Sequence, residues 1–384
     1  MRIETVELIR LSGSRTGPNP DVPFVHPHKT ERIAAGYVKI LTDTGIAGLF
    51  GPLDIDPSHL IPFAKHLIGR DPLQGETLWR EMHRDSFRFG HKNHGVLSAL
   101  TAIDNALWDL RGKHCGMPVY QLLGGPTRKK VRVYASALCG SREPDIAREQ
   151  AKALQEAGFT AQKWFLRKWP SWNQDPEDLA RHTALAQGLR ETLGDSYDLM
   201  FDAVMTWDLT YALRMARKLA DFNPLWLEEP LPSTQLEGFR RIKREVGIPL
   251  AAGEHLYTRM ELKPYLDAGV LDYAQCDTDW SGGITELTKV CAFAETYGTK
   301  VIPHGSNLVS SLHVIASQMD WVCPMQEYLV GSVATLQHFH KQPLLATDGY
   351  LTLPKAPGLG IEIDESKVES SETICLASSA KPEN

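Results

Sequence analysis

The chain has few cysteines, no excess of positive charge and no long apolar run, and each absence excludes a class of protein. The six cysteines are scattered without a CxxC pair, which indicates reduced thiols in a cytoplasmic protein. Lys plus Arg number 41 against 47 Asp plus Glu, a net charge of −6, so no basic surface is expected to bind nucleic acid. No apolar run reaches the roughly 18 residues that span a bilayer. The first ten residues alternate like a strand and lack the layout of a signal peptide.

Several common site motifs are missing as well. There is no GxGxxG that opens a helix, no GxxxxGK[ST] and no GxSxG, so nucleotide binding and serine hydrolysis have no support. An HxH pair, His26 and His28, is typical of zinc hydrolase barrels, but that class needs the pair on the first barrel strand. Here the pair lies in a loop about a hundred residues earlier, which argues against zinc. As loop residues above a barrel, His26, His28 and Arg32 could still contact a substrate.

Length and pattern predict an α/β fold of two parts. At 384 residues and 42% hydrophobic composition, we expect one large domain with a smaller companion. Residues 1–127 read as an α+β capping domain, with strands, an irregular loop over about residues 12–30, and then helices. The run that ends at Pro126 marks the boundary.

Strand-like and helix-like runs alternate through residues 128–341, which predicts a modified (β/α) TIM-type barrel. Residues 342–384 return to Pro- and Gly-rich sequence, and we expect this segment to pack on the capping domain. The eight predicted strands are Val131–Ser136, Thr160–Phe165, Asp198–Asp202, Leu225–Glu228, Pro249–Glu254, Asp272–Asp277, Thr299–His304 and Met325–Tyr328.

Three acids at equal spacing are the most informative feature. Asp202, Glu228 and Glu254 are 26 residues apart at each step, and each ends an apolar run. Adjacent parallel strands lie about 4.8 Å apart, so the three carboxylates should converge on one small volume. They cannot all stay ionised there without a cation. Oxygen ligands of this kind suit Mg²⁺, so we predict a Mg²⁺ site.

The ends of the remaining strands also carry ionisable groups. Asp277 ends one predicted strand and His304 the next, and a carboxylate beside an imidazole fixes its tautomer and raises its basicity. We expect His304 to act as a general base. Glu327 ends the last strand, and near other acids it should be protonated and able to donate to developing oxyanion charge. Glu229 neighbours Glu228, but strand alternation and the equal spacing favour Glu228 as the ligand.

The same residues resemble the enolase superfamily, in its mandelate racemase subgroup. The resemblance is carried by Val119–Gly125 before the barrel, Trp226–Pro230, Gly253-Glu254, and the pair Asp277 and His304. It implies a modified barrel under an α+β capping domain and one essential Mg²⁺. It also implies abstraction of a proton α to a carboxylate, with the metal and its neighbours holding the enediolate, and an even-numbered homo-oligomer.

Within that subgroup the chain is most similar to acid-sugar dehydratases. The runs Asp277–Glu286 and Val301–Ser306 look like those of L-rhamnonate dehydratases, whereas Gly253–Arg259 looks more like the galactonate type. The resemblance therefore implies the class of substrate and leaves the sugar open.

One position departs from the racemases of the subgroup. They carry Lys-x-Lys at the end of the second barrel strand, and the second Lys is a base that faces the His. Here the run is Lys163-Trp-Phe165, so a two-base racemase would lack one base. A dehydratase needs only one, because His304 could take the C2 proton and return it to the leaving C3 hydroxyl. Lys163 and Arg167 remain candidates for binding the substrate carboxylate or hydroxyls.

The sequence therefore predicts a cytoplasmic, Mg²⁺-dependent dehydratase of a sugar acid, such as rhamnonate, lyxonate or galactonate, that gives a 2-keto-3-deoxy acid. The expected partner is the small-molecule substrate, with no nucleic acid or membrane. Two alternatives remain open: a racemase or epimerase of a 2-hydroxy acid, and a non-catalytic metal-binding protein.

Overall fold

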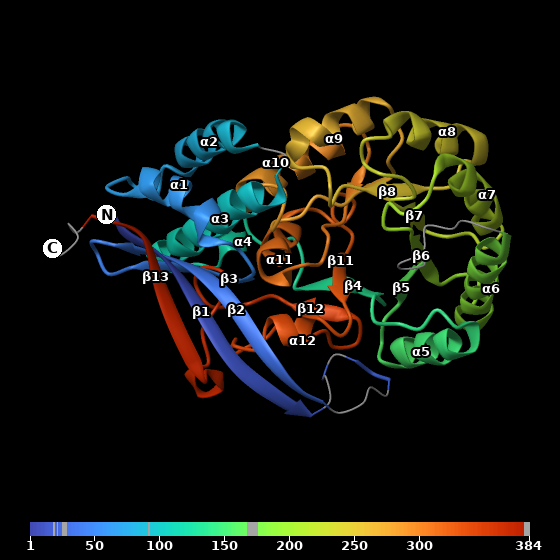
Figure 1. The fold of residues 1–384 in the computed structure, drawn as a ribbon, viewed down its shortest axis with the longest axis horizontal. Helices are drawn as coiled ribbons and strands as arrows, with labels where there is room; N and C mark the ends of the chain where they lie inside the picture. The colour runs from blue at the N-terminus through green and yellow to red at the C-terminus, as the bar shows by residue number, and fades with distance from the viewer. Residues whose placement is uncertain (18–19, 21, 25–28, 91–92, 167–175, 380–384) are drawn as a thin grey trace.

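The computed structural model describes residues 1–17, 20, 22–24, 29–90, 93–166 and 176–379, which form two sheets with their covering helices (Figure 1). The first strands and the last strand of the chain make one sheet, at the left of Figure 1. The second sheet is curled, and α5 to α8 lie along its outer side at the right. Within the described residues, no helix has both the length and the apolarity needed to cross a membrane.

The smaller sheet is antiparallel, in the order β13-β1-β2-β3. Its strands are β1 (Ile3–Gly17), β2 (Lys29–Thr42), β3 (Ala47–Leu53) and β13 (Ser370–Ser378). The pairing of β1 with β2 extends as far as Gly17 opposite Lys29. The predicted extent of the irregular loop, about residues 12–30, is therefore wrong at both ends. Backbone hydrogen bonding continues through residues that lack an alternating apolar pattern.

Helices cover this sheet and connect it to the barrel. They are α1 (Pro57–Leu67), α2 (Gly75–Ser86), the 3₁₀ turn η1 (Phe87–Phe89), α3 (His94–Cys115) and α4 (Val119–Leu122). The predicted burial of the segment around Val96–Leu110 is confirmed, since α3 is buried along most of its length between the sheet and α10. A helix that is buried on every side needs the nearly uniform apolar composition that this segment has.

The second sheet confirms the predicted order of eight parallel strands. Its path is β10-β9-β8-β7-β6-β5-β4-β11, curled as a barrel-type sheet with β10 and β11 at its edges. The strands are β4 (Lys130–Ser136), β5 (Ala161–Phe165), β6 (Asp198–Asp202), β7 (Trp226–Glu228), β8 (Leu250–Ala252), β9 (Tyr273–Ala274), β10 (Lys300–Val301) and β11 (Gln326–Leu329). The helices are α5 (Pro144–Glu156), α6 (Pro176–Leu193), α7 (Leu209–Ala220), α8 (Leu236–Val246), α9 (Thr258–Asp267), α10 (Gly283–Glu295), α11 (Leu308–Ser317) and α12 (Val333–Leu336).

Strands β8 to β10 are shorter than the apolar runs predicted. Gly253 has φ +145°, a backbone conformation that turns the chain out of the β8 ladder. Pro303 has no N–H to extend β10. Glu254, Asp277 and His304 therefore follow their strands by two or three residues instead of ending them.

The C-terminal segment contacts both parts of the chain. Strand β12 (Tyr350–Thr352) pairs antiparallel with β4 of the barrel, the turn η2 (Glu365–Lys367) follows, and β13 pairs antiparallel with β1. The segment therefore contacts the capping domain through β13 and ties that domain to the barrel through β12.

Buried polar side chains of α3 join the cap to the loop that follows β9. The Nδ2 of Asn105 donates to the Thr278 carbonyl at 2.7 Å, and its Oδ1 accepts from the Ile284 N–H at 3.1 Å. Asp104 accepts from the Thr285 N–H and hydroxyl at 2.9 and 2.7 Å. Because Thr278 follows Asp277, these bonds hold the carboxylate of the predicted catalytic pair in place.

We predict that Asn105→Ala lowers the free energy of unfolding by about 2–4 kcal/mol, because it leaves a buried carbonyl and a buried N–H without partners. Urea denaturation measures the change. His114→Ala, at an exposed position of the same helix, should stay within about 0.5 kcal/mol of the parent. Equal stability of the two variants would contradict the structural role of Asn105.

Candidate active site

The predicted site residues meet at the carboxyl ends of the barrel strands. Asp202 and Glu228 end β6 and β7 and are Cα partners in the parallel ladder. Glu327 lies within β11, and Glu254 lies in the loop after β8. Since carboxyl ends of parallel strands share one edge, residues far apart in the sequence are brought together here.

Lys163 lies at the centre of these acids. Its Nζ is 2.6 Å from Glu228 Oε1, 2.8 Å from Glu327 Oε1 and 3.1 Å from Asp202 Oδ2, and its side chain is 1% exposed. Burial opposes the charged form, but Glu228, Glu327 and Asp202 together raise the pKa of Lys163 well above its usual value. The ammonium group therefore acts as the shared counter-ion of three carboxylates.

The orientation of Glu228 is fixed by two further donors. Its Oε2 accepts from Trp226 Nε1 at 2.9 Å and from Gln275 Nε2 at 2.7 Å. Trp226 precedes it by two residues on β7, and Gln275 follows β9 directly. The carboxylate is consequently held rigidly, as a metal ligand must be.

The electrostatics of the acids fit a divalent cation. Burial, then repulsion by Asp202, raises the pKa of Glu228 to about 8, although Lys163 opposes the change. Burial raises the pKa of Glu254 to about 7 against the opposing effect of His304, with Glu229 and Glu228 adding to the rise. The pKa of Asp202 rises to about 6, again through burial first. One ammonium does not offset this much buried negative charge, and hard oxygen donors in excess are the ligand set that Mg²⁺ prefers.

Glu229 is closer to the site than strand alternation suggested. It has φ +35°, and its carboxylate lies 2.9 Å from His255 Nδ1, which is 3.2 Å from Glu254 Oε1. Among the described residues, the compact group of possible metal-ligand atoms is Glu229, Glu254 and His255, all within 4.8 Å of one another. Lys163 instead holds Asp202 and Glu228. The prediction that the Glu229 side chain points away from the site is therefore wrong. The left-handed backbone at Glu229 breaks the strand alternation on which that prediction relied.

His304 and Asp277 form the pair that the sequence predicted. The Nδ1 of His304 lies 3.1 Å from Asp277 Oδ2, and its Nε2 lies 3.3 Å from Glu254 Oε2. Asp277 is itself fixed by the backbone N–H groups of Asp279 and Trp280 at 3.0 and 2.8 Å. This arrangement places a proton on Nδ1 and directs Nε2 toward the acid cluster.

The basicity of His304 depends on its neighbours. Burial lowers the pKa of its imidazole, but Glu254, then Asp277 and Glu327, outweigh burial and raise it to about 10. Because Glu254 is the largest of the raising influences, a cation bound to Glu254 would bring the pKa of His304 back toward neutrality. A general base needs that shift.

The ionisation state of Glu327 differs from the one predicted. Burial raises its pKa, but Lys163 and then His304 outweigh burial and lower it to about 2, and its Oε2 accepts from the Gly305 N–H at 2.9 Å. The structure therefore favours an ionised Glu327 instead of the protonated group that we expected, because the Lys163 ammonium contacts it directly.

The other predicted site residues differ in their distance from the acid cluster and in their burial. Lys163, a candidate for binding the substrate carboxylate or hydroxyls, is buried among the acids. Phe165 is its neighbour, with the Lys163 Nζ 5.5 Å from the centre of the ring. Arg32 is exposed on β2 and shares no hydrogen bond or ion pair with the described residues of the site. His26, His28 and Arg167 lie outside the described residues.

Sequence reasoning missed two polar residues of the site, Gln275 and His255. Gln275 follows the short apolar strand β9 and precedes Asp277 by two residues, so its position on the same face was a usable signal. His255 follows a predicted metal ligand directly, and adjacency alone does not indicate which way it points.

Family comparisons cover most of the chain. Residues 146–367 match the family described as enolase C-terminal domain-like, and residues 23–124 match the N-terminal domain of mandelate racemase / muconate lactonizing enzyme. A D-galactonate dehydratase of Ralstonia nicotianae is 32% identical over an alignment of 347 residues, and the match covers 86% of this chain and 89% of that protein. An L-rhamnonate dehydratase of Saccharopolyspora erythraea is 33% identical over an alignment of 311 residues, with 78% of this chain and 75% of that protein covered.

Solved structures agree with this assignment. A member of the enolase superfamily from Salmonella Typhimurium has a TM-score of 0.84 and 26% identity, and the match covers 97% of this chain and 99% of that one. The 3,6-anhydro-D-galactonate cycloisomerase from Zobellia galactanivorans has a TM-score of 0.78 and 27% identity, with 96% and 100% covered. Members of this superfamily use Mg²⁺. The chain is thus an enzyme, and it belongs to the enolase superfamily, in its mandelate racemase subgroup.

Proposed function

We propose that this enzyme is a Mg²⁺-dependent hydro-lyase that dehydrates a sugar acid to a 2-keto-3-deoxy acid. The observation that carries the proposal is the His304 imidazole, held at Nδ1 by Asp277 and directed at Nε2 into a cluster of buried acids. Curated relatives of similar length that cover most of the chain are named D-galactonate and L-rhamnonate dehydratases, which supports the reaction class.

Asp202, Glu228 and Glu254 would hold the cation. When bound, Mg²⁺ supplies a Lewis acid that polarises the substrate carboxylate and acidifies the neighbouring C2–H bond. Lys163 adds a second positive charge next to that position, and its ammonium could bind a carboxylate or hydroxyl oxygen of the substrate once Asp202 and Glu228 turn from it to the cation. Trp226 and Gln275 keep the Glu228 carboxylate from rotating.

His304 is the group proposed to move protons. Its Nε2 takes the proton from C2, while Asp277 stabilises the imidazolium through Nδ1. The same Nε2 then returns the proton to the departing C3 hydroxyl, which leaves as water. The enol that results rearranges to the 2-keto-3-deoxy acid. Phe165, beside Lys163 on β5, offers no second base on the other face of C2.

We predict that a panel of aldonates and aldarates contains at least one acid from which the enzyme releases a keto acid, detected with semicarbazide. EDTA should abolish this release and added Mg²⁺ should restore it. A metal-loaded enzyme that releases no keto acid from any member of the panel would argue against the proposed reaction.

The single-base arrangement predicts that the C2 epimer of the substrate does not accumulate during turnover. Chiral chromatography of the residual substrate measures this directly. An epimer that forms at a rate comparable with dehydration would favour the racemase or epimerase alternative.

His304→Asn should reduce exchange of the C2 proton with deuterated solvent by about 10²–10⁴-fold, since it removes the group that takes the proton. Asp277→Asn should retain the fold but lose about 10–100-fold through loss of orientation and basicity. NMR of the substrate in D₂O gives the exchange rate, and Mg²⁺ binding by calorimetry shows that each variant is folded. Exchange at the parental rate in His304→Asn would assign the proton to another group, with Lys163 the first candidate.

The raised pKa values of the acids predict how Mg²⁺ affects stability. A carboxyl whose pKa is raised by folding favours the folded state at low pH, and that contribution is lost as pH rises through the folded pKa, here about 6 to 8. Mg²⁺ should therefore raise the Tm by several degrees more at about pH 8.5 than at about pH 5.5. Differential scanning fluorimetry with EDTA or excess Mg²⁺ measures both values. The same Mg²⁺ effect at both pH values would show that these acids do not bind the cation.

A further inference from the structure

Two buried thiols lie together between α10 and the segment that leads into β11. The Sγ atoms of Cys291 and Cys323 are 3.6 Å apart, and either thiol can donate to the other. Neither side chain has any exposed surface. At this separation the two sulfur atoms are in van der Waals contact. The two thiols are therefore placed to react with each other once one of them is oxidised.

The pair lies beside the seam of the barrel, which is the junction between β10 and β11. These strands form the two edges of the sheet, and they share no ladder in the part of the chain that the structure describes. The Val301 N–H donates to the Val322 carbonyl at 2.8 Å, directly before Cys323. His304 follows β10 and Glu327 lies in β11, so the seam also joins two strands that supply residues of the candidate active site.

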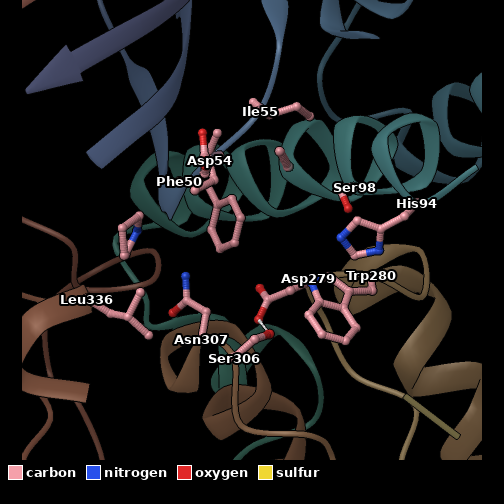
Figure 2. A pocket seen from close by; sticks show the side chains of 13 residues that line it. Phe50, Asp54, Ile55, His94, Ser98, Asp279, Trp280, Ser306, Asn307 and Leu336 are labelled. Atoms are coloured by element: carbon pink, nitrogen blue, oxygen red, sulfur yellow. Dashed lines mark hydrogen bonds between the residues drawn. The ribbon is translucent and has the colours of Figure 1, made fainter. Parts of the chain in front are cut away.

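The carboxyl end of the seam faces a cavity of about 280 Å³ between the cap and the barrel loops (Figure 2). Ser306 and Asn307, which follow β10, line this cavity, and Figure 2 shows them below Phe50 of the cap. Cys291 and Cys323 do not line it. Cys323 precedes β11 and so lies at the amino end of the seam. The cavity therefore gives an oxidant no direct route to the thiols.

The environment of the pair favours the reduced state in the closed protein. The hydrogen bond to Cys323 and then burial raise the pKa of the Cys291 thiol well above its usual value. Peroxide reacts with the thiolate, so a buried thiol of this kind reacts slowly. Oxidation therefore requires local opening, which occurs most easily where few backbone hydrogen bonds join neighbouring segments. The seam is such a place.

We propose that Cys291 and Cys323 form a reversible disulfide when hydrogen peroxide oxidises the protein, and that this bond covalently closes the seam of the barrel. Peroxide first converts one thiol to a sulfenic acid and releases one water. The other thiol then attacks that sulfur, so that the S–S bond forms, the S–O bond breaks and a second water leaves. Two thiols and one peroxide thus give one disulfide and two waters.

The test uses a background variant that keeps only the three fully buried cysteines. Serine replaces the three that are exposed or partly exposed, Cys115, Cys139 and Cys375. Thiols are titrated in denaturant before and after treatment with hydrogen peroxide, and mass spectrometry of unreduced peptides identifies the link. Cys291→Ala and Cys323→Ala each remove one partner.

Cys276→Ala in the same background is the matched control. Cys276 is equally buried, but its thiol donates to the Leu256 carbonyl at 3.4 Å. Differential scanning fluorimetry gives the Tm of each protein before oxidation, after oxidation and after dithiothreitol. The Tm before oxidation shows whether each alanine variant is folded. Identification of the linked peptide in the background protein does not depend on either variant.

Peroxide should remove two of the three thiols, link Cys291 to Cys323 and raise the Tm by about 5 °C, because the bond closes a loop between positions 32 residues apart. Dithiothreitol should restore both thiols and the original Tm. Cys276→Ala should behave like the background, whereas the two partner variants should form no link. Three titratable thiols after treatment, a link that includes Cys276, thiols that dithiothreitol does not restore, or a link without a rise in Tm would overturn the proposal.

Discussion

The structure of this site depends on the convergence of buried carboxylates on a single ammonium group. Asp202, Glu228 and Glu327 each lie within about 3 Å of Lys163 Nζ, and Glu254 is directed at His304. Buried charges of one sign are tolerated only when cations offset them. The parallel barrel supplies the geometry, because the strand ends share one edge, and the uncompensated part of the charge would favour the binding of a divalent cation. The same charge raises the pKa of the His304 imidazole.

The capping domain covers the barrel and also fixes one of its loops. Asn105 and Asp104 on α3 bind the backbone between Thr278 and Thr285, so a helix of the first domain fixes the loop that carries Asp277. The C-terminal segment strengthens this connection by pairing with β4 and with β1.

Much of this arrangement could be predicted from the sequence. The same physical reasons explain why the predictions for Glu229 and Glu327 were wrong. The order of the barrel strands and the pairing of His304 with Asp277 follow from apolar runs that alternate with amphipathic helices. The three acids were found because they recur at a fixed spacing, although only Asp202 and Glu228 end their strands and Glu254 follows β8 by two residues. Glu229 was misjudged because its left-handed backbone has no signature in a glutamate. The ionisation of Glu327 was misjudged because the reach of Lys163 into the acid cluster depends on side-chain packing that periodicity does not encode.

We propose that Asp202, Glu228 and Glu254 bind one divalent cation beside Lys163, although among the described residues Glu229, Glu254 and His255 form the compact group of possible ligands. The most direct measurement is a crystal structure with Mn²⁺ in place of Mg²⁺, with the ion located by its anomalous scattering. We predict one ion with an oxygen of each of the three acids at about 2.1 Å and His304 Nε2 outside the coordination shell. An ion bound by Glu229 and His255, with Asp202 and Glu228 still paired to Lys163, would contradict it.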